Sequence, residues 1–459
     1  MNGTTENLGS GKILPLVFKL TLPAVVAQLV TFLYNIVDRI YVAKIDGDGM
    51  NALAALGVVL PVTLIMQAFA NLVGMGGAPR ASIKIGEGDE REAGKIFNTS
   101  ALLLLCFGVA LSVAAFVFAE SVVTAFGCPD GAIDFAVSYL KIYACGTVFV
   151  MLAQGLNPFI TAQGRSVTAM CSVVLGALVN VVLDPLFIFV FKMGVKGASL
   201  ATVISQGLSF LWIIIFLSSD KSIFRFTASD MKLNVKRVFS VLSLGFSPFV
   251  MTVTECAIQI VFNINLNLST NGNKDYTAAL TIMLSALQLI SLPLNGLGYG
   301  MQPFVGYNYG KGDADRLKKG ILCVTCIAFV FAVAVWSVSM AFPVVYAYLF
   351  SASEEVKAIV VAYTPYFLMG SIMFFVQMTL QNINVALGQS LSALCLAVMR
   401  KVVILIPLCF ILTDRLGFKG VYMSEGIADL VAGIITAIVI SVTFSRIFKT
   451  MKQKNEKNN

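Results

Sequence analysis

Twelve long apolar segments, separated by short polar ones, constrain this chain more than any other feature of its sequence. A membrane-spanning helix needs about 20 mostly apolar residues, and each segment is long enough to supply one. We therefore expect an all-α polytopic membrane protein. The expected helices cover residues 16–38, 52–77, 95–119, 133–157, 166–190, 197–218, 239–265, 278–302, 319–343, 357–385, 391–413 and 420–444.

The composition agrees with a membrane location and excludes several classes of protein. Only 12% of the 459 residues are charged and 58% are hydrophobic, whereas an ordinary soluble domain carries about 25% charged residues. The chain has no histidine, which excludes imidazole metal ligands and histidine bases. The sequence also has no nucleophile elbow and no phosphate-binding loop. We therefore expect neither an enzyme nor a bound cofactor.

The basic residues predict how the chain crosses the membrane. The net charge is +8, but Lys and Arg lie in short loops between apolar segments, so membrane topology explains them better than nucleic-acid binding does. With the N-terminus in the cytoplasm, the cytoplasmic segments hold 21 basic residues and the outside loops hold 8. This bias predicts that both termini are cytoplasmic. Polar residues in the first apolar segment favour a retained helix over a cleavable signal peptide.

The two halves of the sequence repeat at an offset of about 224 residues. The run Gly74-Met-Gly-Gly-Ala-Pro79 matches Gly298-Tyr-Gly-Met-Gln-Pro303, and Gly86-Glu-Gly-Asp89 matches Gly310-Lys-Gly-Asp313. Six helices in each half give both halves the same orientation, as in transporters whose two lobes move around a central cleft. The predicted organisation is an N-lobe over residues 1–218, a cytoplasmic linker over 219–237, a C-lobe over 238–445 and a basic cytoplasmic tail over 446–459.

Polar side chains inside the apolar segments of the first half predict an ion site, because ionisable groups are costly within a membrane. Asp38 ends the first segment, and Asn180 and Asp184 are four residues apart on one face of the fifth. Asn157 ends the fourth segment and Thr202 begins the sixth. Such oxygen atoms suit Na⁺ or a shared proton. The alternative is that the two acids cap helices or lie at the membrane interface.

Polar side chains of the second half are expected either in a substrate cleft or between helices. Glu255 begins a stripe that recurs every four residues as far as Asn267. Arg400 and Lys401 lie within the eleventh segment, and a buried Glu255–Arg400 pair is the structural alternative to substrate or proton binding by Glu255. The residues expected in the cleft are Tyr34, Asn35, Gln154, Glu255, Gln259, Asn263, Gln288, Gln377 and Gln381.

These motifs resemble those of the MATE (multidrug and toxic compound extrusion) family, most closely its MepA-type bacterial branch. The resemblance covers essentially the whole chain and rests on the order of Asn35-Ile-Val-Asp38, Gly74–Arg80, Gly86–Asp89 and Asn180-Val-Val-Leu-Asp184-Pro185. It implies two pseudo-symmetric six-helix lobes around a V-shaped cleft, with cationic or amphipathic drugs exported by alternating access in exchange for H⁺ or Na⁺. The ion site that it implies, with Na⁺ as one occupant, consists of Asp38, Asn180, Asp184 and Thr202, with Asn157 adjacent.

The resemblance also implies the partners and the location of the chain. We expect small lipophilic or cationic substrates, the lipid bilayer, no nucleic acid, and a monomer in the bacterial cytoplasmic membrane. Some members of the family carry an acidic pair on the seventh and tenth helices; Glu255 is present here, but residues 369–377 contain no Asp or Glu. The alternatives are a lipid-linked oligosaccharide flippase of the same superfamily, a major-facilitator-type transporter, and a membrane enzyme or receptor.

Overall fold

The chain is helical throughout the part that the computed structural model describes, which comprises residues 8–45, 49–227, 229–350 and 352–458. Within these ranges there is no strand, and twelve helices are long and apolar enough to cross a membrane. Large apolar side chains such as Val113, Val182 and Ile438 are exposed, as expected of surfaces that face hydrocarbon. The predicted class, a multi-pass all-α membrane protein, is confirmed.

The chain forms two compact units. The first comprises Val26–Phe249 with the residues up to Ser10, and the second comprises Gly11–Val25 with Val250–Asn459. The helices α2 (Ile13–Ala43) and α9 (Val235–Ser269) therefore each contribute to both units. The lobes, linker and tail predicted from the sequence, with boundaries at residues 218, 237 and 445, stay a proposal.

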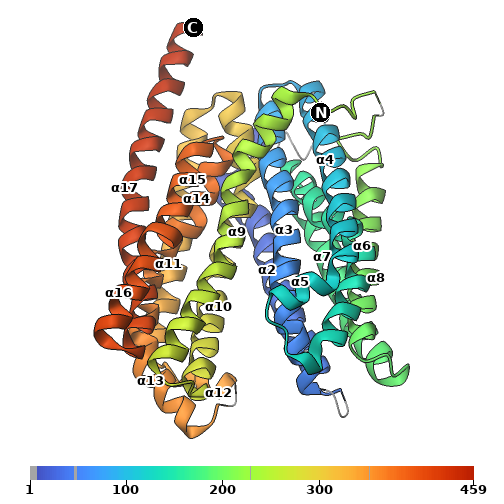
Figure 1. The fold of residues 1–459 in the computed structure, drawn as a ribbon. Coiled ribbons are helices and arrows are strands. Elements are labelled where there is room, and N and C mark those ends of the chain that lie inside the picture. The colour runs from blue at the N-terminus through green and yellow to red at the C-terminus, as the bar shows by residue number, and fades with distance from the viewer. Residues whose placement is uncertain (1–7, 46–48, 228, 351, 459) are drawn as a thin grey trace. The chain divides into compact units, whose positions relative to one another are not determined.

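A bundle of long helices builds the first unit, and Figure 1 shows them in blue to green. Helix α6 packs against α3, α4 and α8, and α7 packs against α8. The helices between α2 and α9 are α3 (Gly49–Gly86), α4 (Glu90–Val117), α5 (Ala119–Ala125), the 3₁₀ turn η1 (Asp130–Ala132), α6 (Ile133–Ala162), α7 (Ser166–Pro185), the π-helical turn η2 (Leu186–Val190) and α8 (Val195–Leu217).

The segment between α8 and α9 is held against the first unit by side chains of α4 and α6. The ring of Phe224 is fully buried and stacks on Phe97 with ring centroids 5.2 Å apart. The amide of Asn98 donates to the carbonyl oxygen of Arg225 at 2.9 Å and accepts from the backbone N–H of Thr227 at 3.1 Å. These contacts satisfy backbone groups that no helix satisfies, so this segment is a packed part of the first unit.

The second unit repeats several local features of the first. Asp89 and Asp313 both cap the helix that follows, because each side chain accepts a 2.9 Å hydrogen bond from a backbone N–H three residues later. The elements of this unit after α9 are α10 (Lys274–Lys311), α11 (Ala314–Ala341), α12 (Val344–Leu349), α13 (Glu354–Leu368), η3 (Met369–Met373), η4 (Phe375–Leu380), α14 (Gln381–Ala386), α15 (Ser390–Val398), η5 (Met399–Leu405), α16 (Ile406–Leu416) and α17 (Phe418–Asn458). Helix α17 continues through the predicted tail, as Figure 1 shows in red.

Matching glycines let equivalent helices approach closely in both units. A Cβ atom on Gly146 of α6 would collide with Val203 of α8, and one on Gly370 of η3 would collide with the carbonyl oxygen of Gly426 in α17. Gly146 and Gly370 are related by the repeat offset of 224 residues. Small residues permit this backbone approach between membrane helices, so the repeat extends to the packing of the fourth helix on the sixth and the tenth on the twelfth.

Candidate functional site

The acidic pair predicted from the sequence is brought together in the first unit. Asp38 lies on α2. Asp184 is the second-last residue of α7, which ends at Pro185 and is followed directly by η2. Asp184 is 0% exposed, and the two carboxyl groups are close enough to hydrogen-bond to each other when one carries a proton. One turn earlier, Nδ2 of Asn180 donates to Oδ1 of Asp184 at 3.2 Å. Two carboxyl groups and one amide therefore form a single polar cluster.

Three oxygen atoms of this cluster are buried without a hydrogen-bond partner among the described residues. They are Oδ1 of Asp38, Oδ1 of Asn180 and Oδ2 of Asp184. Buried acceptors are normally satisfied, and two ionised carboxylates side by side repel each other. A proton or a monovalent cation between these oxygens would remove both penalties. The donor set consists of hard oxygen atoms and fits H⁺ or Na⁺.

A small cavity of about 70 Å³ lies beside Asp38. It is lined by Thr202 and Gln206 of α8 and by Tyr139 and Tyr143 of α6. The hydroxyl of Thr202 donates to the carbonyl oxygen of Ala198 at 3.0 Å and is within hydrogen-bond reach of Tyr139. The cavity has room for a few water molecules, so it suits a proton or a small ion.

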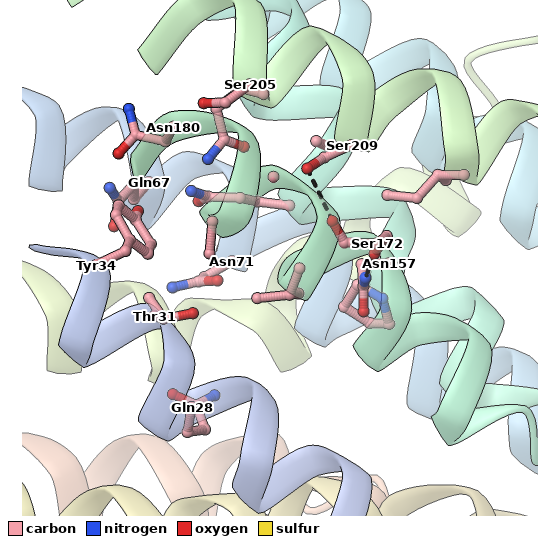
Figure 2. A pocket seen from close by; sticks show the side chains of 18 of the residues that line it. Gln28, Thr31, Tyr34, Gln67, Asn71, Asn157, Ser172, Asn180, Ser205 and Ser209 are labelled. Carbon is pink, nitrogen blue, oxygen red and sulfur yellow. Dashed lines mark hydrogen bonds between the residues drawn. The ribbon is translucent and has the colours of Figure 1, made fainter. Parts of the chain in front are cut away.

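A larger cavity of about 250 Å³ adjoins the small one within the first unit (Figure 2). Both cavities are lined by Tyr34, Gln67, Gln154 and Gln206. Among the described residues, the larger cavity is lined by amides, hydroxyls and apolar groups and by no charged side chain. Orienting polar groups among apolar ones are typical of small-molecule sites. A ligand in this cavity would lie next to the side chains that surround Asp38.

Asn157 lines the larger cavity and not the smaller one. Its Nδ2 donates to the carbonyl oxygen of Ala169 at 3.0 Å and to Oγ of Ser172 at 2.6 Å. Figure 2 shows Asn157 and Ser172 together, apart from Tyr34 and Asn180. The amide of Asn157 joins α6 to α7, and the structure places it away from the acidic pair.

The other residues expected in a cleft fall into three groups. Tyr34, Asn35 and Gln154 line the cavities of the first unit. The side chains of Gln259, Asn263 and Gln288 are exposed in the second unit. Gln377 and Gln381 are buried, and their Nε2 atoms donate to the carbonyl oxygens of Asp429 at 2.5 Å and Ala393 at 3.4 Å. These contacts favour the alternative in which the last two amides bond helix to helix.

The Glu255–Arg400 pair that was one alternative for these residues does not form; two other ion pairs are present instead. Oε1 of Glu255 lies 3.0 Å from Nζ of Lys401. Nε of Arg400 donates to Oδ1 of Asp429 at 2.8 Å. Adjacent residues in the π-helical turn η5 point to different partners, which their sequence positions did not reveal. The sequence analysis also missed Glu425 and Asp429, although two acids four residues apart in an apolar segment are a signal of the kind that identified Asn180 and Asp184.

The same spacing would have identified further residues of the first unit. Gln67 and Asn71 of α3, Tyr139 and Tyr143 of α6, and Thr202 and Gln206 of α8 are each separated by four residues and line the cavities. Only Thr202 was expected there. Polar residues four apart lie on one helix face, and in an apolar helix that face is directed away from lipid.

Comparison with known families identifies the class of this chain. The family model MatE matches residues 23–186 and 249–411, one stretch in each half. The chain belongs to the MatE family. The two matched stretches agree with the repeat seen in the sequence and include Asp38, Asn180 and Asp184.

Relatives of this MatE protein are export proteins, which agrees with the prediction of a transporter and not of an enzyme. The multidrug export protein MepA of Staphylococcus haemolyticus is 26% identical over 421 residues, which cover 92% of this chain and 91% of the relative. The multidrug export protein MepA of Staphylococcus aureus is 25% identical, with 93% of each chain covered. The predicted resemblance to the MepA-type branch is confirmed.

Solved MATE structures share the fold of this chain. A crystal structure of a MATE protein in complex with MaD3S has a TM-score of 0.90 and 23% identity, and covers 98% of this chain and 99% of that one. The outward-facing conformation of a multidrug resistance MATE transporter of the MOP superfamily has a TM-score of 0.89 and 23% identity, with 97% and 99% covered. At this identity the structures establish the common fold.

Proposed function

We propose that this MatE protein is a secondary active multidrug exporter. It exchanges cationic or amphipathic small molecules for H⁺ or Na⁺ by alternating access, and acts as a monomer. The observation that carries the proposal is the buried Asp38–Asp184 pair with its unpartnered oxygens beside the amide-lined cavity. The named relatives, which are multidrug export proteins, support the same class of substrate.

The shared lining of the two cavities supports coupling between ion and substrate. A cation at Asp38 and Asp184 reduces the negative charge of the cluster and changes the hydrogen bonding available to Tyr34 and Gln67, which also line the larger cavity. A ligand in the larger cavity contacts the same two side chains. Each ligand therefore alters the affinity for the other, and by thermodynamic linkage the effect is reciprocal. Exchange follows if ion and substrate favour opposite-facing states.

Ethidium efflux from proteoliposomes tests this function. The purified protein is given an imposed Na⁺ gradient or, separately, an imposed pH gradient. We expect efflux with one of the two gradients, and loss of that efflux in Asp38→Asn and in Asp184→Asn. Asp220→Asn is the matched control, because the Asp220 side chain is 99% exposed. Gradient-driven efflux that persists in both cavity variants would contradict the proposed ion site.

The location that we propose is the bacterial cytoplasmic membrane, with both termini in the cytoplasm. The excess of basic residues in the segments assigned to the cytoplasm supports it. Reporters fused to the C-terminus test the orientation: a fluorescent protein that matures only in the cytoplasm should be active, and a phosphatase that matures only outside should be inactive. The reverse pattern would contradict the orientation.

A further inference from the structure

Five ionisable side chains gather in the second unit and take no part in the site described above. Arg400 of η5 contacts Asp429 of α17 at 2.8 Å and lies 3.7 Å from Glu425 of the same helix. Lys401 of η5 contacts Glu255 of α9 at 3.0 Å, and its charge also acts on Glu425 and Asp429. The ring of Phe374 covers the guanidinium of Arg400 at 5.2 Å. The cluster is thus built from three helical segments.

The charges of this cluster do not balance. In the described part of the chain, three carboxyl groups (Glu255, Glu425 and Asp429) face two cations (Arg400 and Lys401). The thiol of Cys409 on α16 also faces Glu425, but it is neutral in its protonated form. One negative charge therefore remains in excess if all three carboxyls are ionised. An uncompensated charge is costly in a buried site within a membrane helix.

The buried atoms of this cluster that lack a hydrogen-bond partner belong to its two buried acids and to a nearby amide. Oε2 of Glu425 and Oδ2 of Asp429 are buried without a hydrogen-bond partner among the described residues, and so is Oε1 of Gln377 beside them. The side chains of Glu425 and Asp429 are 2% and 1% exposed. A protonated carboxyl group is a hydrogen-bond donor. One proton on Glu425 or Asp429 would both cancel the excess charge and supply a donor where acceptors are unmatched.

The internal repeat relates this pair to two residues beside the ion site of the first unit. The offset of 223 residues that relates Gly197 to Gly420 also relates Thr202 to Glu425 and Gln206 to Asp429. Thr202 and Gln206 both line the small cavity beside Asp38. In the second unit, carboxyl groups therefore occupy the positions whose first-unit counterparts are neutral and line the acidic site.

We propose that Glu425 and Asp429 form a second proton-binding site, which holds one proton between them. A proton suits the site better than a metal ion, because Arg400 is always charged and would repel a cation placed beside Asp429. The half-exposed side chain of Glu255, 51% exposed, connects the cluster to the surface of the unit through Lys401. The charge of Lys401 acts on Glu425 and Asp429 as well as on Glu255, so it links the exposed acid to the buried ones.

Infrared spectroscopy of the full-length protein in lipid nanodiscs tests the proposal. The carbonyl stretch of a protonated carboxyl group is recorded at pH 7 in water and in heavy water. The Asp38→Asn/Asp184→Asn variant serves as the background, because it removes the acids of the first unit. We expect a carboxylic acid band equivalent to about one group per chain, and loss of that band in Glu425→Gln, whose amide resembles the protonated acid in shape.

Two further variants make the outcome decisive. Lys401→Met removes one positive charge, so a second carboxyl group should be protonated and the band should about double. Glu355→Gln is the matched control, because this exposed side chain on α13 should leave the band unchanged. The proposal is overturned if the background variant has no such band, if the band survives in Glu425→Gln or in Asp429→Asn, or if Lys401→Met leaves it constant. The spectra require no substrate, so failed export would not affect this result.

Discussion

The side chains of Asn180 and Asp184 are joined by a hydrogen bond of 3.2 Å across one turn of α7. Nδ2 of the asparagine is the donor. Its Oδ1 and Oδ2 of the aspartate are both buried without a hydrogen-bond partner among the described residues. The amide therefore does two things at once. It fixes the orientation of the carboxyl group, and it presents a further oxygen to whatever binds there.

Removing this amide should weaken ion binding without destroying the carboxyl pair. A hydrogen bond to a charged group contributes about 1.5–3 kcal/mol, which corresponds to roughly 10- to 100-fold in affinity. We expect Asn180→Ala to raise the ion concentration for half-maximal ethidium efflux by about that factor. Asn71→Ala is the control, because Asn71 lines the same larger cavity as Asn180, but it is Asn180 that donates to Asp184. Equal effects of the two variants on the ion dependence would be evidence against this role of Asn180.

The contact between α3 and α6 predicts a cost for one added methyl group. A Cβ atom on Gly74 would lie 2.7 Å from the carbonyl oxygen of Gly155. The Cβ would be fixed to the backbone of one helix and the oxygen belongs to the backbone of the other, so the helices themselves must shift. We therefore expect Gly74→Ala to destabilise the protein by about 1–3 kcal/mol. In Gly94→Ala the new atom meets nothing within 4 Å, so this control should be stable or more stable. Thermal unfolding in detergent distinguishes the two; a Gly74→Ala protein as stable as the wild type would refute the expectation.

The packed segment between the predicted lobes should contribute to stability. Phe224 is fully buried against Phe97 and Phe159. Truncation of a buried phenylalanine costs about 3–5 kcal/mol, so we expect Phe224→Ala to lower the unfolding temperature strongly. Phe239, near the start of α9, is 73% exposed, and Phe239→Ala should have little effect. Limited proteolysis should cut the segment faster in Phe224→Ala; unchanged proteolysis would indicate that the packing is not retained in solution.

The buried Arg400–Asp429 pair should behave differently from an exposed one. Removing one partner of a buried pair leaves an uncompensated charge and costs about 3–5 kcal/mol, so Arg400→Met should destabilise the protein. Adding Asp429→Asn removes one of the stranded charges and should restore part of the loss. The exposed Arg225–Asp220 pair provides the comparison, because its side chains are 70% and 99% exposed and Arg225→Met should change nothing measurable. Additive effects of the two buried substitutions in unfolding experiments would show that the pair is not coupled.

The class, the helices and the first acidic cluster could each be predicted from the sequence, and the physical reason differs from one to the next. Helix number follows from the length of apolar segments, which one residue does not alter. Asp38 and Asp184 were identified because acids in apolar segments are rare, and Asn180 because it precedes Asp184 by four residues on the same helix face. The partner of Glu255 was not predictable, because η5 places the adjacent Arg400 and Lys401 toward different acids, and a π-helical turn changes the direction of every later side chain. Asn157 was grouped with the first acidic cluster because it ends an apolar segment of the same half and because the family resemblance implied it, but its Nδ2 donates to groups of α7.

The helices shared between the two units limit how the chain can be divided. Residues 13–25 of α2 belong to the second unit, and residues 235–249 of α9 belong to the first. A fragment that ended in the 219–237 segment would therefore lack part of its own unit, and the complementary fragment would lack residues 11–25. The two halves of the sequence repeat are therefore not the same pieces of chain as the two compact units. Two such fragments made separately should each remain incomplete.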